Sequence, residues 1–200
     1  MMKRREALEI FARHRGDAPV IVGPSFGGRI LFDLDHREAT IYNMELGYPT
    51  AMCLGLALAL PGERIFALEG DGSMLAGLGA LTTVARYKPP NLVIVVIDNG
   101  VYATTGAVKS AAGCGADIAA MGRAAGIAAA ERVANANAFG TSLTRATREP
   151  GPFLIVAEVE PDDASAAAEA RAMPFDVVEA AIRFRRALEE RGLVPTIWAV

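Results

Sequence analysis

Two short polar segments of the sequence combine glycine with side chains that can bind a metal ion or a phosphate group. Gly-Asp-Gly-Ser at 70–73 follows a strand-like run at 64–69, and Asp-Asn-Gly-Val-Tyr at 98–102 ends a second run at 92–98. Glycine lets the backbone approach a ligand closely, and free amides at a helix start can receive an anion such as a diphosphate. A carboxylate beside an anion repels it unless a cation lies between them, so Asp71 indicates a bridging divalent metal.

Magnesium fits these residues best, because it binds through one or two carboxylates together with phosphate oxygens. Asn99 lies 28 positions after Asp71, which is enough chain for one helix and one strand and returns it to the same edge of a parallel sheet. Asn99 offers its side-chain carbonyl, and the turn through Gly100 can direct the backbone carbonyl of Val101 at the same ion. Each segment alone is most often an ordinary turn, whereas the pair, each after a buried strand, favours a functional site.

The elements around these segments alternate between helix and strand. The apolar patterns predict helices at 5–14, 50–60, 74–87, 118–125 and 136–147 and strands at 19–23, 39–42, 64–69, 92–98 and 153–159. The run at 92–97 is apolar at every position, as expected of a strand that helices cover on both faces. The predicted fold is therefore α/β, a doubly wound and mainly parallel sheet with helices on both faces, whose ligands lie beyond the carboxyl ends of the strands.

Two segments interrupt this alternation. The residues at 104–115 are mostly small, with nothing large to anchor them, which predicts a mobile loop. After residue 160 the strand pattern ends, and 175–191 has the periodicity of a charged amphipathic helix that packs outside the domain or against a partner. We therefore expect a ligand-binding domain at 1–160 and a C-terminal helical extension at 161–200.

Composition argues against several other classes. The 200 residues, 52% of them hydrophobic, suffice for one core, since a domain has roughly 100 to 200 residues. The 20 basic residues are balanced by 23 acidic ones and are not clustered into a basic stripe, so nucleic acid is not an expected partner. The longest apolar stretch, 51–60, is far short of the ~20 residues that span a bilayer, so we expect no membrane partner. Two cysteines without metal-ligand spacing and an N-terminus unlike a signal peptide indicate a cytoplasmic protein.

The two polar segments resemble the thiamine diphosphate motif, GDG followed by a segment of this length and then N, of the cofactor-binding domains of thiamine diphosphate enzymes. Their surroundings, ELGYPTAMCLGLALA at 45–59 and DNGVYATTG at 98–106, are similar to β subunits of sulfopyruvate and phosphonopyruvate decarboxylases. The resemblance covers about residues 1–160 and implies a thiamine diphosphate-binding fold. It implies that Mg²⁺ is held by Asp71, Asn99 and the carbonyl of Val101. The residues that it places near the diphosphate are Gly70, Gly72, Ser73 and Met74.

Three further residues have two interpretations each. Leu46 stands where the family places a large aliphatic residue beneath the bent cofactor, although a leucine is otherwise an ordinary core residue. Ser25, in the turn after the first strand, is a diphosphate contact or only a turn former. Tyr102 closes over the cofactor or is a half-buried aromatic. Close relatives carry Ser-Thr-Gly-Gly-Gln where this chain has Thr-Thr-Gly-Ala-Val at 104–108, so the substrate-side loop has diverged.

The resemblance implies a lyase, a decarboxylase that uses thiamine diphosphate and Mg²⁺ on a small 2-oxo acid. In this superfamily a glutamate on a separate pyrimidine-binding domain activates the cofactor, and we expect no such domain in this chain. The expected enzyme is a hetero-oligomer in which a pyrimidine-domain partner subunit carries that glutamate, so no catalytic residue is assigned here. A carboligase of the acetolactate synthase type, or a non-catalytic cofactor-binding or regulatory subunit, would share the same cofactor residues. A dinucleotide-binding domain is disfavoured, because no GxGxxG turn follows the first strand.

Overall fold

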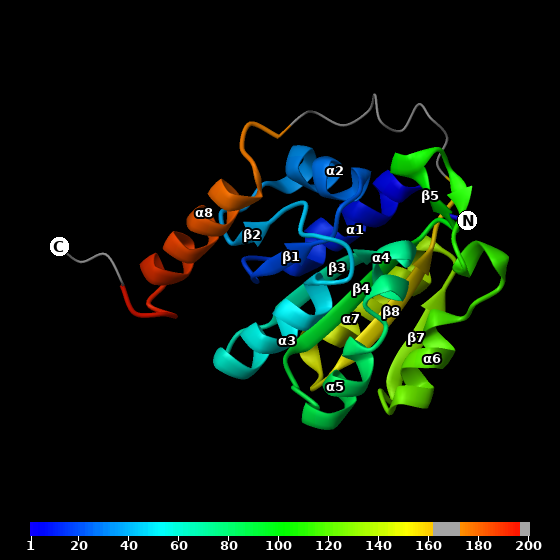
Figure 1. Cartoon of the computed structure of the whole chain (residues 1–200). Helices are drawn as coiled ribbons and strands as arrows, with labels where there is room; N and C mark the ends of the chain where they lie inside the picture. Colours follow the sequence, from blue (N-terminus) through cyan, green and yellow to red (C-terminus); the bar gives the residue numbers. More distant parts are fainter. Residues whose placement is uncertain (162–172, 197–200) are drawn as a thin grey trace.

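A parallel β-sheet with helices on both faces forms the centre of the computed structural model, which describes residues 1–161 and 173–196 (Figure 1). Its strands are β1 (Val20–Val22), β2 (Thr40–Ile41), β3 (Ile65–Gly70), β4 (Leu92–Asp98), β7 (Ala129–Val133) and β8 (Phe153–Glu158). They are ordered β2-β1-β3-β4-β8-β7, and every neighbouring pair is parallel. The predicted fold class is confirmed.

Two layers of helices cover the sheet, one on each face. One layer contains α3 (Pro49–Ala59), α5 (Ala80–Tyr87) and α6 (Ile118–Ala125), and the other contains α1 (Arg4–Arg15), α2 (Phe26–Asp35) and α7 (Ala136–Arg148). Successive side chains of β4 point into opposite layers: Ile94 and Val96 belong to the first hydrophobic cluster, and Val93 and Val95 to the second. Burial on both faces explains why this strand is apolar at consecutive positions.

The chain changes direction across the sheet at β1. From β1 it passes to β2 on one side, and it then returns to β3 on the other side of β1. At such a switch point a crevice opens beyond the carboxyl ends of the two strands, and ligands of doubly wound sheets bind there. Ser25 follows β1 and Asp71 follows β3, so both residues lie at this crevice.

Three elements differ from those expected from the sequence. The predicted helix at 74–87 is two helices, α4 (Asp71–Ala76) and α5, separated at 77–79. The break lies where Gly77 meets the backbone of Gly47: a Cβ on Gly77 would be only 2.2 Å from the Gly47 carbonyl oxygen. α2 and β7 were not predicted, because two glycines weaken the helical pattern of α2 and β7 includes a glutamate and an arginine.

The segment predicted as a mobile loop, 104–115, contains short elements of secondary structure. β5 (Val101–Tyr102) and β6 (Val108–Lys109) form an antiparallel hairpin around the 3-10 turn η1 (Ala103–Thr105), and a second 3-10 turn, η2 (Ala112–Cys114), follows. The segment 104–115 is attached to the rest of the domain through its backbone rather than through a large side chain. The Ser110 amide donates to the Gly100 carbonyl at 3.0 Å, and Ser110 is buried.

The amphipathic helix predicted near the C-terminus is α8 (Val177–Glu190), which packs beside the edge strand β2 (Figure 1). Phe184 and Leu188 share a hydrophobic cluster with Ile41 of that strand. The helix therefore covers an edge that would otherwise present unpaired backbone groups. Residues 162–172 and 197–200 of the expected extension lie outside the described residues. Within the described ranges, no helix combines the length and apolar character needed to cross a membrane.

Candidate functional site

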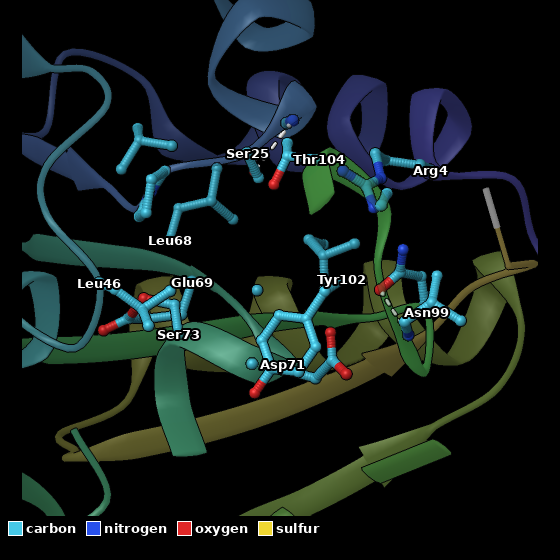
Figure 2. Close-up of a pocket in the computed structure, with 18 of the residues that line it drawn as sticks. Arg4, Ser25, Leu46, Leu68, Glu69, Asp71, Ser73, Asn99, Tyr102 and Thr104 are labelled. Carbon is cyan, nitrogen blue, oxygen red and sulfur yellow. Dashed lines mark hydrogen bonds between the residues drawn. The ribbon is translucent and has the colours of Figure 1, made fainter. Parts of the chain in front are cut away.

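A cavity lies at the switch point, beyond the carboxyl ends of β1, β3 and β4 (Figure 2). The predicted site residues that line it are Ser25, Leu46, Gly70, Asp71, Gly72, Ser73, Asn99, Val101 and Tyr102. Met74 does not line the cavity, because its side chain is fully buried in the cluster that also contains α3 residues. The cavity volume is about 60 Å³, well below the roughly 300 Å³ or more of typical small-molecule pockets. These residues alone therefore do not enclose a ligand the size of a coenzyme.

The register of β3 and β4 brings the candidate metal ligands to one edge. Gly70 is paired with Ile97, so Asp71 and Asn99 follow directly after neighbouring strand ends, and both are buried. The Asn99 side-chain oxygen accepts a hydrogen bond from the Val101 amide at 3.3 Å, and an amide oxygen retains a second lone pair for another partner. Gly100 between them has φ +69°, a conformation that glycine adopts without strain.

The cavity lining at this edge includes Asp71, Asn99 and Val101, residues that carry a carboxylate, an amide oxygen and a backbone carbonyl. Magnesium favours this donor set and completes its coordination with waters and phosphate oxygens. Among the residues that the structure describes, no group of three His, Cys, Asp or Glu is placed to hold a metal ion. The donor set therefore fits a magnesium ion that also binds an anionic ligand better than it fits a zinc site.

Burial and neighbouring charge shift the pKa values of two carboxyl groups at this edge. Burial raises the pKa of Asp71, and the hydrogen bond that it accepts from the Ser110 hydroxyl is the largest of the influences that lower it. Burial also raises the pKa of Asp98, and the nearby charge of Asp71 raises it further. A divalent cation between such carboxylates and an anion would stabilise their ionised forms.

A buried hydrogen-bond network holds the β3 side of the cavity. The Glu69 carboxylate accepts from the Thr50 amide at 3.0 Å, from the Thr50 hydroxyl at 2.9 Å and from the Ser73 hydroxyl at 2.5 Å. The Ser73 oxygen in turn accepts from the Gly47 amide at 3.1 Å. Glu69 is only 2% exposed, and burial raises its pKa while these hydrogen bonds lower it. The network fixes the loop that carries Leu46 at the cavity rim.

Neither the network nor its role was predicted. A glutamate inside an otherwise apolar strand was the only signal in the sequence, since a buried carboxylate needs hydrogen-bond donors. The structure also shows what the predicted residue Ser73 does: its hydroxyl is engaged by Glu69 and Gly47, so it orders the protein rather than pointing freely into the cavity.

Ser25 and Tyr102 both line the cavity, and each also has a structural role. Ser25 is the N-cap of α2, where its hydroxyl oxygen accepts from the Gly27 amide at 3.0 Å, and it also lines the cavity. The half-buried Tyr102 ring lies against Gly72: a Cβ there would be 2.2 Å from the ring carbon Cε1. Only glycine fits beneath the ring.

Arg4 and Thr104 line the cavity as well, although nothing in the sequence distinguished them. Arg4 begins α1, and its neighbours Lys3, Arg5 and Glu6 are also charged. Arg4 is only 8% exposed, in contrast to the partly exposed Arg5 side chain.

Known proteins resemble this chain in sequence. Residues 36–157 match the family described as thiamine pyrophosphate enzyme, C-terminal TPP binding domain. A phosphonopyruvate decarboxylase from Streptomyces hygroscopicus is 33% identical over 158 residues, which are 78% of this chain and 38% of that protein. The sulfopyruvate decarboxylase subunit beta of Methanococcus maripaludis is 28% identical over 161 residues, 80% of this chain and 85% of the relative. The chain thus spans less than half the length of the first relative.

Solved structures resemble it in fold. A thiamine diphosphate-dependent 4-hydroxybenzoylformate decarboxylase from Rhodococcus jostii superposes with a TM-score of 0.67 at 22% identity, covering 80% of this chain and 33% of that one. Benzoylformate decarboxylase from Polynucleobacter necessarius gives a TM-score of 0.65 at 18% identity, over 78% of this chain and 33% of that one. At these identities the likeness concerns the fold alone.

Proposed function

Since the chain belongs to the thiamine pyrophosphate enzymes, through their C-terminal TPP-binding domain, we propose that it is the thiamine diphosphate- and Mg²⁺-binding subunit of a 2-oxo acid decarboxylase. The relatives named phosphonopyruvate decarboxylase and sulfopyruvate decarboxylase subunit beta support this reaction class. In this proposal residues 1–160 form the cofactor-binding domain, and 161–200 are an extension of it. The two free cysteines, one of them exposed, suit the reducing cytoplasm.

The observation that carries the proposal is the convergence of Asp71, Asn99 and Val101 on one cavity at the ends of neighbouring strands. In the proposed complex their oxygens hold Mg²⁺, and the diphosphate lies along Gly70, Gly72 and Ser73. The residues are anchors rather than acid or base catalysts, because a carboxylate bound to a metal does not exchange protons freely.

The remaining cavity residues would orient the cofactor and exclude water. Thiamine diphosphate, when bound, supplies the electron sink that decarboxylation of a 2-oxo acid requires. Leu46, held in place by the Glu69 network, presents an apolar side chain at the rim for the cofactor ring to pack on. Tyr102 covers Gly72 and would have to shift to admit a diphosphate there.

A partner subunit is the second part of the proposal. The cavity is too small to enclose the whole cofactor, and relatives are named as beta subunits. α3 supports a partner too, since its Cys53 and Leu54 are buried whereas Met52 and Leu58 are exposed. A helix that is apolar on all sides is usually buried on all sides. We propose that the partner carries the activating glutamate and covers α3 and Leu46.

Binding of the cofactor tests the first part. Calorimetry of the full chain with thiamine diphosphate and Mg²⁺ is expected to show binding that Asp71→Asn weakens by at least about 100-fold, since the metal loses its charged ligand. Asp117→Asn, at the partly exposed N-cap of α6, is the matched control and is expected to bind like the unmodified chain. Equal affinity of Asp71→Asn and the control would contradict the assignment.

Association with the partner tests the second part. Met52→Glu inserts a charge into the exposed face of α3 and is expected to abolish co-purification with a pyrimidine-domain subunit, because a buried unpaired charge is strongly unfavourable. Asn137→Glu makes the same kind of change on α7, at the opposite face of the sheet, and is expected to leave association intact. Association that survives Met52→Glu would place the partner elsewhere.

A carboligase of the acetolactate synthase type would use the same cofactor residues. The names of the relatives favour decarboxylation without carbon–carbon bond formation. Product analysis of the assembled enzyme decides between them: an aldehyde released in equal amount with carbon dioxide supports the decarboxylase, and a condensation product with a hydroxyl group next to a ketone, such as a 2-hydroxy-3-oxo acid, supports the carboligase. Cofactor binding without turnover in the assembled complex would support a non-catalytic subunit.

A further inference from the structure

Arg4 is a buried cation in the candidate cofactor cavity. It lines the cavity together with Asp71, Asn99 and Thr104, and Figure 2 shows it on the Asn99 side, across the cavity from Leu46. The N-terminal segment holds it there through backbone pairing: Met2 forms a parallel bridge with Val159, and the Glu160 amide donates to the Met2 carbonyl at 3.0 Å. The start of α1 is thereby tied to the end of β8, next to the carboxyl end of β4.

The position is electrostatically unfavourable for an arginine unless an anion is near. A helix N-terminus carries a partial positive charge, so cations are favoured at the other end of a helix. Burial adds the cost of removing the guanidinium from water. Asp71 is one of the groups that offset this cost, because the charge of Arg4 is one of the influences that lower the pKa of Asp71. In the proposed complex, however, the charge of Asp71 is directed at Mg²⁺.

We propose that Arg4 binds the diphosphate of the cofactor, on the side away from Leu46, as a second cationic contact beside Mg²⁺. This inference rests on the proposed function. A diphosphate carries more negative charge than one Mg²⁺ neutralises, and Asp71 adds a further negative charge to the site. A guanidinium presents its N–H donors in a planar fork that matches two phosphate oxygens. Its place beside the two metal ligands, rather than at the Leu46 rim, assigns it to the diphosphate and not to an anionic tail of the substrate.

Magnesium pyrophosphate is the probe that tests Arg4, because it contains the diphosphate without the thiamine ring or a substrate. Calorimetry with the full chain is expected to show that Arg4→Gln weakens binding of magnesium pyrophosphate and of magnesium thiamine diphosphate by about tenfold or more. Arg5→Gln is the matched control, since Arg5 lies next to it on α1 with a partly exposed side chain. The control is expected to change neither affinity by more than about twofold.

If Arg4 only balances the charge of Asp71, Arg4→Gln should not weaken the binding of magnesium pyrophosphate. Removing a positive charge beside a metal site would then leave the affinity for magnesium pyrophosphate unchanged or raise it, and either result overturns the inference while the proposed function stands. If the unmodified chain binds neither probe, the proposed function fails and the inference fails with it.

A second measurement does not require Arg4→Gln to fold. The Nε–H resonance of Arg4 is the arginine signal that disappears from the ¹⁵N spectrum of Arg4→Lys. It is expected to shift when magnesium pyrophosphate is added to the unmodified chain, as a direct contact with phosphate requires. A resonance that stays in place while the probe binds overturns the inference.

Discussion

The two sides of the cavity are built differently. On the β3 side, Glu69, Thr50 and Ser73 are each no more than 3% exposed, and their hydrogen bonds join a strand, a loop and two helices. On the β4 side, Val101 and Tyr102 belong to a two-residue strand of a surface hairpin, and the facing Val108 and Lys109 are exposed. One side is part of the core, and the other is attached to it by a few contacts.

Because of this difference, mutations on the two sides should affect different properties: the free energy of unfolding on the β3 side and ligand affinity on the β4 side. Changes on the β3 side should lower the free energy of unfolding, because they leave buried donors without acceptors or force backbones apart. Changes on the β4 side should cost little stability, because the hairpin buries few side chains, and they should weaken ligand binding only where the changed side chain contacts a cavity residue. The following substitutions test the contrast in order of decreasing expected effect.

Glu69→Ala should have the largest effect. The Thr50 amide and hydroxyl and the Ser73 hydroxyl lose their common acceptor, which is expected to reduce the free energy of unfolding by about 3 kcal/mol. Glu69→Gln keeps one acceptor oxygen and should cost about half as much. Urea denaturation measures both. A loss below about 0.5 kcal/mol for Glu69→Ala would show that the network contributes little to the β3 side.

Gly77→Ala should have the second largest effect on the free energy of unfolding. Its Cβ would lie 2.2 Å from the Gly47 carbonyl oxygen, and both contacting groups are backbone, so overpacking is expected to lower the unfolding free energy by about 2 kcal/mol. Gly79→Ala is the matched control, because a Cβ there meets nothing within 4 Å and φ is −58°. Thermal unfolding should rank the two variants clearly, and equal midpoints would refute the close approach.

Ser110→Ala tests the β4 side. Asp71 loses the hydroxyl that orients it, and the Gly113 amide loses its acceptor at 3.2 Å. Affinity for magnesium thiamine diphosphate is expected to fall about tenfold, whereas the free energy of unfolding should fall by only about 1 kcal/mol. Thr105→Ala, at the exposed turn of the hairpin, should change neither quantity. A stability loss as large as that of Glu69→Ala would remove the contrast between the two sides.

Val108→Ser should have the smallest effect. Val108 is 64% exposed on the outer strand of the hairpin, so its replacement is expected to change the unfolding free energy by less than about 0.5 kcal/mol. Cofactor affinity of the chain alone should also be unchanged. Reduced affinity, measured by the same calorimetry, would mean that the hairpin surface and not only Ser110 controls the site.

How far the site could be predicted varies from residue to residue. The position of Asp71 and Asn99 at the cavity could be predicted because each directly follows a long apolar strand, and parallel strands end at a common edge. Met74 was expected near the diphosphate, but its side chain points into the core. Distance along a helix does not reveal which face a residue occupies when the helix start is displaced, and α4 starts at Asp71, three residues before the predicted start.

The apolar strands and the spacing of two polar turns were enough to predict the parallel sheet and the edge of the sheet at which the cavity lies. Tertiary structure alone decided which other side chains meet there. Pairing of the N-terminal segment with the residue after β8 places Arg4 at the cavity, and the close approach of Gly100 and Gly113 places Ser110 there. Glu69 is held by hydrogen-bond donors from two other segments, α3 and α4. The physical reason is that periodicity reports which face of an element is buried, whereas a hydrogen bond between distant residues depends on how whole elements pack.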